Sequence, residues 1–342
     1  MVDLLVNVTY KILCLFAKRK YVVFLVNFNS DVYGNLTIIH KRVSQCIKTK
    51  SVLLKSDGVL SYVRELYLIA NAKIVVVDCT HWLIAKININ KYTKIIYIGH
   101  GGGVFKKMGY ANSNNIKRNC ASKLRKLYGQ YSYVLATTDQ FDLEIMQNYR
   151  IKSSQIIYCG LPRTDVLVNN GNIDIEDNSV FIAPSYFTNS NGIRSINLDI
   201  EALDRVVKHN HLKVYISIHP DMRTKINIPV GWRLVARKAI YEKLLKSEIF
   251  ITDTSSLMFD FSCTRRPIIV IKGINDVSDN IWNFNNINKY VNVCKNMDEL
   301  QQLINNKELL KKSDSFFNKF MGYCNGQSAV MIGNFIVREY LK

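Results

Sequence analysis

Several features that mark other classes of protein are missing from this chain. No run among its 342 residues approaches the roughly 18 apolar residues that a membrane-spanning helix needs. None of its eight cysteines belongs to a C-x-x-C pair, so we expect no zinc site and reduced thiols typical of a cytosolic protein. Repeats of solenoid length are also missing. These absences favour an ordinary globular protein.

Acidic residues are scarce relative to basic ones. The chain has 46 Lys and Arg but only 27 Asp and Glu, which gives a formal net charge of +19. Such a surface attracts polyanions or an anionic membrane. The basic residues are dispersed, and no RRM, zinc-finger or helix-turn-helix signature accompanies them. A phosphate-rich substrate or an anionic lipid surface explains the charge as well as nucleic acid does.

The N-terminal stretch LLVNVTYKILCLFA is apolar, but it is interrupted by Lys11 and followed by Lys18, Arg19 and Lys20. It lacks the charged start and the cleavage site of a signal peptide. The pattern fits an amphipathic helix on a membrane surface and fits a core helix equally. Of the two, we expect the core helix.

Ten short apolar runs alternate with helical segments along the chain. Such runs suit strands that are buried on both faces of a parallel sheet. They span residues 21–28, 51–56, 73–78, 94–99, 133–138, 155–160, 179–185, 212–219, 248–253 and 267–272. Expected helices include residues 197–209, 238–246 and 256–263. Alternating strands and helices predict a doubly wound α/β architecture.

The length suits two domains of about 150–170 residues each. The polar stretch VNNGNIDIEDNS at residues 168–179 has the composition of a linker. We therefore predict two facing Rossmann-like domains with a cleft between them, residues 1–170 and 171–342. This is the GT-B type of glycosyltransferase architecture. The helical segment from about residue 326 could pack back across the cleft.

Histidine occurs only six times, and two histidines directly follow predicted strands. Ligands of open α/β sheets bind beyond the carboxyl ends of the strands, so His100 and His219 are candidate site residues. His100 opens HGGGVFKKMG (100–109), where glycines allow close backbone approach and lysines such as Lys106 suit phosphate. A histidine that titrates near neutrality suits a general base. The ordinary alternatives are a loop histidine and a structural histidine at a strand end.

Two further segments place phosphate-binding groups at strand ends. GLPRTD (160–165) brings Arg163, whose guanidinium suits bidentate phosphate binding, although it could instead pair with Asp165 at the surface. TDTSSLMFDF (252–261) ends a strand at Asp253 and starts a helix, whose free N–H groups favour phosphate. We expect Thr254, Ser255 and Ser256 to cap that helix and Asp260 to face a ligand. An ordinary helix cap is the commoner structure.

These segments, in their order and spacing, resemble the CDP-glycerol glycerophosphotransferase family of teichoic-acid and capsule enzymes. The family carries His-Gly-Thr-Pro-x-Lys-Lys-x-Gly, Gly-x-Pro-Arg-x-Asp, Arg-x-His-Pro and Thr-Asp-Tyr-Ser-Ser followed by Phe-Asp. Here the matching segments are HGGGVFKKMG, GLPRTD, ISIHP (216–220) and TDTSSLMFDF, spread over roughly residues 70–275. APSYF (183–187) is similar to the family's Pro-Thr segment.

This chain departs from the family pattern at four places. Gly102 and Gly103 replace Thr-Pro, with one extra residue before the lysines. Ser217 stands where the family usually has Arg, Thr254 replaces Tyr, and Ala111 replaces an acid. These changes surround the expected reaction centre.

The resemblance implies a transferase that moves glycerol phosphate or ribitol phosphate from a CDP-alditol to a lipid-linked saccharide or growing polymer, releasing CMP. His100 and His219 would be catalytic, with His100 as general base. The first domain would hold the acceptor and the second the cytidine nucleotide. Donor phosphates and hydroxyls would be held by Gly101, Gly102, Lys106, Gly160, Arg163, Asp165, Pro184, Ser185, Asp253, Thr254, Ser255, Ser256 and Asp260.

The same resemblance implies neither cofactor nor metal, no nucleic acid partner, and a cytoplasmic enzyme attached peripherally to an anionic membrane at its inner face. Two other functions stay open. A sialyl-type CMP-sugar transferase would carry an acidic Asp/Glu-Asp/Glu-Gly segment, of which Ser56-Asp57-Gly58 has only one acid. A basic protein that binds nucleic acid or membrane would show strongly salt-dependent binding.

Overall fold

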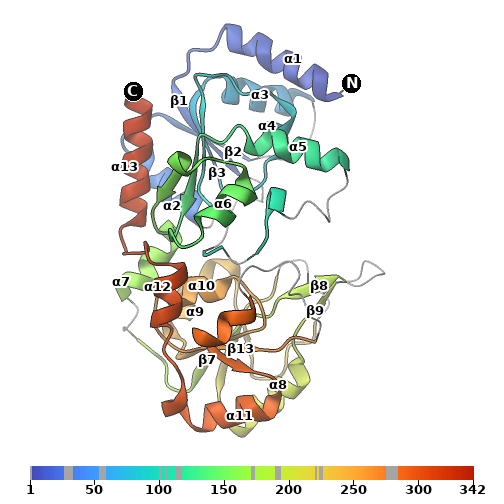
Figure 1. Cartoon of the computed structure of the whole chain (residues 1–342), viewed down its shortest axis with the longest axis vertical. Coiled ribbons are helices and arrows are strands. Elements are labelled where there is room, and N and C mark those ends of the chain that lie inside the picture. The colour runs from blue at the N-terminus through green and yellow to red at the C-terminus, as the bar shows by residue number, and fades with distance from the viewer. Residues whose placement is uncertain are drawn as a thin grey trace. The chain divides into compact units, whose positions relative to one another are not determined.

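The computed structural model describes residues 2–26, 34–53, 59–99, 102–104, 106–111, 118–170, 174–188, 194–219, 222, 226–274 and 284–342. The chain divides into two compact units. The first comprises residues 1–100, 107–165 and 323–342, and the second comprises residues 101–106 and 166–322. The predicted boundary between residues 170 and 171 lies close to the change of unit at residue 165. Both units are drawn in Figure 1.

The first unit is built on a six-stranded parallel sheet in the order β2-β1-β3-β4-β5-β6. Its strands are β1 (Tyr21–Val26), β2 (Thr49–Leu53), β3 (Ala72–Val77), β4 (Lys94–Tyr97), β5 (Tyr133–Ala136) and β6 (Ile156–Tyr158). Val22 to Val26 and Ile74 to Val77 are all buried, as expected for strands that are covered on both faces.

Helices cover both faces of this sheet (Figure 1). The helices of the unit are α1 (Val2–Leu15), α2 (Asn35–Val43), α3 (Val59–Ala70), α4 (Trp82–Lys86), α5 (Arg118–Tyr128), α6 (Asp142–Tyr149) and α13 (Ser328–Leu341). α1 contacts α3 and α4, whereas α13 contacts α2 and β3. The predicted C-terminal helix therefore packs in the first unit, where the buried Glu339 carboxylate pairs with Lys94 of β4 at 2.5 Å.

The second unit contains a parallel sheet in the order β11-β10-β7-β12-β13-β14. Its strands are β7 (Ser179–Ile182), β10 (Lys213–Ile216), β11 (Arg233–Leu234), β12 (Ile249–Thr252), β13 (Ile268–Ile271) and β14 (Asn292–Cys294). Counted within the unit and without the hairpin β8 (Tyr186–Thr188) and β9 (Arg194–Ile196), this is the Rossmann order 3-2-1-4-5-6. The order reverses between β7 and β12.

The two faces of the second sheet are packed by different side chains. On one face Val180, Ile182, Ile249 and Ile251 join an aliphatic core. On the other face the alternate residues Phe181 and Phe250 stack, with ring centroids 5.9 Å apart. The covering helices are α8 (Ile200–His209), α9 (Ile240–Lys246), α10 (Leu257–Ser262), α11 (Met297–Asn305) and α12 (Asp314–Phe320), while α7 (Asp165–Asn170) joins the two units.

The predicted elements are confirmed. Each of the ten apolar runs overlaps a strand, and the three expected helices are α8, α9 and α10. The sequence did not predict the hairpin β8–β9, the edge strand β11 or β14. These strands are two or three residues long and lack a continuous buried run, so they give no periodic signal.

The prediction of a core helix at the N-terminus is largely wrong. Within α1 only Val6 and Tyr10 are buried. Val2, Leu4, Leu5 and Leu15, with Phe16 just beyond the helix end, are each at least two-thirds exposed. Among the described residues, no helix is both long and apolar enough to cross a membrane.

Candidate active site

The candidate site lies at the carboxyl edge of the second sheet, where the strand order reverses. β7 and β12 are neighbouring parallel strands there, with Phe181 opposite Phe250 and Ile182 opposite Ile251. Pro184 and Ser185 follow β7, and Asp253 directly follows β12. Two predicted segments, APSYF and TDTSSLMFDF, therefore meet at the position where open α/β sheets bind ligands.

Asp253 is the hydrogen-bonding centre of this edge, although only 1% of it is exposed. One carboxylate oxygen accepts the backbone N–H of Ser185 at 2.6 Å. The other accepts the Ser185 hydroxyl, the Asn197 side-chain amide at 2.9 Å and the Thr254 hydroxyl at 3.3 Å. A buried carboxylate with this many donors is well satisfied. Asp253 therefore holds the loops after β7 and β12 in place.

The serine-rich segment forms the start of a short helix. α10 begins at Leu257, and Ser256 occupies the N-cap position without a side-chain cap bond. The Ser255 hydroxyl instead accepts the Leu257 N–H at 3.4 Å, and the Ser255 N–H donates to the Thr252 hydroxyl at 3.0 Å. The predicted capping by Ser256 is thus not formed, and its exposed side chain remains available at the surface.

Asp260 does not have the exposure that a ligand-facing residue needs. It is 1% exposed and accepts a hydrogen bond from the Tyr241 hydroxyl of α9 at 2.7 Å. The expectation that Asp260 faces a ligand is therefore corrected: its carboxylate lies in the packing between α9 and α10.

The glycine-rich segment of the second unit packs against α10. A Cβ on Gly102 would lie 2.5 Å from Sδ of Met321, and a Cβ on Gly103 would lie 2.5 Å from the Phe259 ring. Gly103 also has a φ of +60°, which favours glycine. The close approach of neighbouring side chains thus explains why both positions are occupied by glycine. His100 and Gly101, also predicted for this site, lie outside the described residues.

Lys106 supplies positive charge near this edge. Desolvation by surrounding protein lowers its pKa, and the Asp253 carboxylate partly opposes that effect. A lysine held near a buried carboxylate at a sheet's carboxyl edge is suited to a phosphate ligand.

His219 lies just beyond β10 and has an exposed side chain. Its ring contacts the Tyr186 ring, with centroids 4.8 Å apart and planes tilted by 49°. The Arg194 guanidinium lies over the same Tyr186 ring, 5.3 Å from its centroid. Sequence reasoning found His219 but missed Tyr186, Arg194 and Asn197. Their places depend on the hairpin β8–β9, which the sequence did not predict.

Three predicted residues belong to the first unit and serve its packing. Both carboxylate oxygens of Asp165 accept backbone N–H groups at the start of α13, from Ser328 at 3.0 Å and Ala329 at 2.8 Å. A Cβ on Gly160 would lie 2.3 Å from the Ser328 hydroxyl. The Arg163 backbone N–H donates to the Asn35 side chain at 3.1 Å. The carboxylate of Asp165 thus caps a helix, while its predicted binding role stays a prediction.

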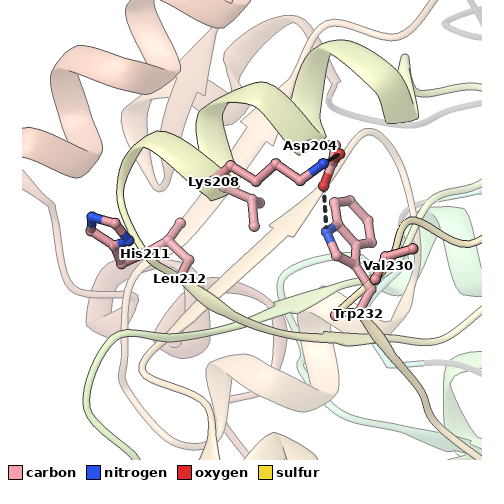
Figure 2. A pocket seen from close by; sticks show the side chains of 8 residues that line it. Asp204, Lys208, His211, Leu212, Val230 and Trp232 are labelled. Atoms are coloured by element: carbon pink, nitrogen blue, oxygen red, sulfur yellow. Dashed lines mark hydrogen bonds and ion pairs between the residues drawn. The ribbon is translucent and has the colours of Figure 1, made fainter.

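A cavity of about 320 Å³ lies elsewhere in the second unit. Figure 2 shows Trp232 donating its indole N–H to Asp204 at 3.0 Å, while Lys208 pairs with the same carboxylate at 2.6 Å. Leu212 and Trp232, which line it, precede β10 and β11. The cavity therefore opens near the amino ends of these strands, and its described lining includes none of the predicted site residues.

The fold defines the class of protein first. The chain aligns with a solved variant of the Wall Teichoic Acid Polymerase TagF with a TM-score of 0.78 and 14% identity, covering 98% of this chain and 94% of that one. The two parallel sheets thus form two Rossmann-like domains of the GT-B type. The family described as CDP-Glycerol:Poly(glycerophosphate) glycerophosphotransferase matches residues 9–338, and the chain belongs to that family.

Curated relatives carry related names. The chain is 26% identical over 231 residues to the teichoic acid glycerol-phosphate primase of Bacillus subtilis, covering 64% of this chain and 60% of that protein. It is 22% identical over 356 residues to the teichoic acid poly(ribitol-phosphate) polymerase of Bacillus spizizenii, covering 94% of this chain and 56% of that protein. The chain therefore spans 60% or less of the length of these two relatives.

Proposed function

We propose that this chain transfers glycerol phosphate or ribitol phosphate from a CDP-alditol to a hydroxyl of a lipid-linked saccharide or growing polymer. The observation that carries the proposal is the Asp253 network at the point where the strand order reverses. It joins Ser185 and Thr254 beside Lys106 and the start of α10. Family membership adds the chemistry, and the relatives' names include both glycerol phosphate and ribitol phosphate.

In the proposed reaction, the acceptor oxygen forms a bond to the β-phosphorus of the donor. The bond from that phosphorus to the bridging oxygen breaks, and its electron pair leaves with CMP. His100 takes the acceptor's proton as general base, a role that typically contributes about 10²–10⁴-fold to rate. Lys106, His219 and the groups around Ser255 and Ser256 stabilise the charge that develops on phosphate. Arg163, a residue of the first unit, stays a proposed phosphate-binding residue on the family resemblance alone.

The direct test is CMP release by the pure protein with a lipid-linked acceptor extract. CDP-glycerol, CDP-ribitol and CMP-sialic acid are supplied in turn, with and without EDTA. We expect release from a CDP-alditol, unaffected by EDTA and lost in His100→Ala. His211→Ala is the matched control, because His211 lines the distant cavity and should leave turnover unchanged. Release from CMP-sialic acid alone would replace the proposal with sugar transfer, and release from no donor would contradict both.

We also propose that the protein works at the inner face of an anionic membrane, docked through α1 and α3. These contacting helices expose Leu4, Leu5, Leu15 and, on α3, Val59 and Leu60. An apolar face of this kind is typical of helices that lie in the membrane interface.

Basic residues accompany that face, which supports an anionic bilayer as its partner. Lys11, Lys18 and Lys20 are exposed, and Lys123 of α5 pairs with Asp3 of α1 at 2.8 Å. Near an anionic surface each such cation contributes about 1 kcal/mol of attraction. Acceptors that carry lipid would be presented at the same surface.

Co-sedimentation with vesicles tests this docking. We expect binding to vesicles that contain phosphatidylglycerol, weakened by salt and largely lost in Leu4→Asp/Leu5→Asp. Val230→Asp is the control, since Val230 is 92% exposed but belongs to the second unit. A double variant that still binds, or a wild-type dimer that the double variant dissociates, would refute membrane docking through this face.

A further inference from the structure

The β8–β9 hairpin is fixed to the candidate site at both of its ends. Ser185, just before β8, donates hydrogen bonds from its N–H and its hydroxyl to the Asp253 carboxylate. Asn197, just after β9, donates a hydrogen bond from its side-chain amide to the same carboxylate at 2.9 Å. The Asn197 N–H also donates to the Ser185 carbonyl at 3.1 Å. One buried carboxylate at the end of β12 thus holds the base of the hairpin.

A second set of contacts holds Asn197 from the other side. The Ile274 N–H donates to the Asn197 carbonyl at 3.1 Å. A Cβ on Gly273 would lie 2.2 Å from the Asn197 side-chain nitrogen, so only glycine fits there. The loop after β13 therefore packs closely against Asn197. The base of the hairpin is placed by packing and hydrogen bonds together, which limits its freedom to move.

The hairpin strands present an aromatic ring and one basic side chain, Tyr186 and Arg194. A second basic side chain, His219, follows β10 and contacts the same ring. Tyr186 of β8 contacts the His219 ring at 4.8 Å, and Arg194 of β9 lies 5.3 Å from the Tyr186 centroid. Thr188 pairs with Arg194 across the hairpin, so the strand pairing fixes the backbone position from which the Arg194 side chain extends. All three groups lie in the second unit, beside the loops that Asp253 holds.

We propose that the strands of this hairpin form a donor-recognition element, in which Arg194 binds the diphosphate of the nucleotide donor. The Tyr186 ring positions the side chains of Arg194 and His219. A guanidinium stacked on an aromatic ring loses less freedom when it binds, because the ring already restricts it. Its planar donor fork matches phosphate oxygens. Tyr186 acts as a positioning residue, since its ring contacts both His219 and Arg194. The inference rests on the proposed function, because it assigns a ligand of the same site.

Calorimetric titration of the full chain with CDP and with cytidine tests the assignment. Arg194→Ala should weaken CDP binding by about tenfold or more, as expected for loss of a charged hydrogen bond, and leave cytidine binding unchanged. Arg194→Lys, which keeps the charge without the fork, should fall between. Tyr186→Ala should weaken CDP binding as well, and Tyr186→Phe should restore it, because the ring is retained.

Arg233→Ala is the matched control. Arg233 also lies over a tyrosine, 5.8 Å from the Tyr215 ring centroid, but on the edge strand β11. Wild-type CDP affinity in Arg194→Ala, or an equal loss for CDP and cytidine, would overturn the role of the hairpin while leaving the proposed function intact. A wild-type chain that binds CDP no better than cytidine would instead remove the diphosphate site itself, and the proposed function with it.

Discussion

At the scale of single residues, Asp253 shows how a buried charge organises the loops of the candidate site. Its carboxylate receives hydrogen bonds from Ser185, Asn197 and Thr254 while remaining 1% exposed. A buried carboxylate with several protein donors is suited to positioning the groups around it. Its effect on substrate is therefore expected to pass through the two loops that it holds.

Replacing Asp253 by Asn should separate positioning from overall stability. The variant keeps the shape but weakens charged hydrogen bonds worth about 1.5–3 kcal/mol each. We expect a lower melting temperature and at least tenfold weaker CDP binding. Asp204→Asn is the control, since Asp204 is bonded to Trp232 and Lys208 away from the site. It should lower the melting temperature and leave CDP affinity unchanged, and an equal loss of affinity in both variants would contradict the positioning role.

Glu65 on α3 is a second buried acid, but one without compensation. It is 3% exposed, and neither carboxylate oxygen has a hydrogen-bond partner among the residues that the structure describes. Burial raises its pKa to about 7. The folded state therefore keeps a proton that the unfolded state loses from about pH 4.5 upward, so stability falls as pH rises toward 7 and then levels.

Glu65→Gln removes this loss of stability at higher pH, because the amide does not ionise. We expect the variant to be more stable than the wild type at pH 8, by roughly 3 kcal/mol or less, and about equal at pH 4.5. Urea unfolding at the two pH values measures the difference. A variant that gains no stability at pH 8 would mean that the carboxylate finds a partner or water in solution.

At the scale of elements, α13 shows how a distant segment is attached to the first sheet. Burial alone would raise the pKa of Glu339, but its bonds to Lys342 and Lys94 outweigh burial and lower it to about 2. Tyr133 of β5 also donates to this carboxylate at 3.3 Å. The helix is thus tied to two strands of the sheet through one side chain.

Glu339→Gln should destabilise the first unit at neutral pH. Because the lysine partners are partly exposed, we expect about 1–3 kcal/mol, less than for a fully buried pair. The folded pKa is depressed, so this stabilisation is present above about pH 4.5 and is lost as pH falls toward 2. The difference between variant and wild type should therefore shrink as pH falls below about 4.5 and be smallest near pH 2. Glu242→Gln, at an exposed pair with Lys243, should change little at either pH.

The same scale shows what the sequence could predict. Strands such as Ile249–Thr252 are buried on both faces, so a continuous apolar run identifies them and places Asp253 at a strand end. The role of Asn197 could not be predicted, because its partner is Asp253, 56 residues away across an unpredicted hairpin. The amphipathic pattern of α1 is the same for a core helix and a membrane helix, so only the observed exposure of Leu4 and Leu5 shows that α1 is not buried in the core.

At the scale of the whole molecule, the two units are expected to respond differently to nucleotide. A ligand that binds only the folded state stabilises it by about 2.7 kcal/mol at a hundredfold excess over Kd. The described site residues around Asp253, with Lys106, His219 and the hairpin, belong to the second unit. Local opening of that unit's carboxyl-edge loops should therefore be suppressed first.

Hydrogen exchange of the intact chain with and without saturating CDP measures this response. We expect slower exchange at residues 183–188, 194–198 and 252–258, because their backbone groups surround the Asp253 network. Residues 230–232, which border the cavity drawn in Figure 2, are the internal reference and should not change. Protection of 230–232 without protection of 252–258 would move the nucleotide to that cavity. The reverse pattern would place the nucleotide at the carboxyl edge of the second sheet.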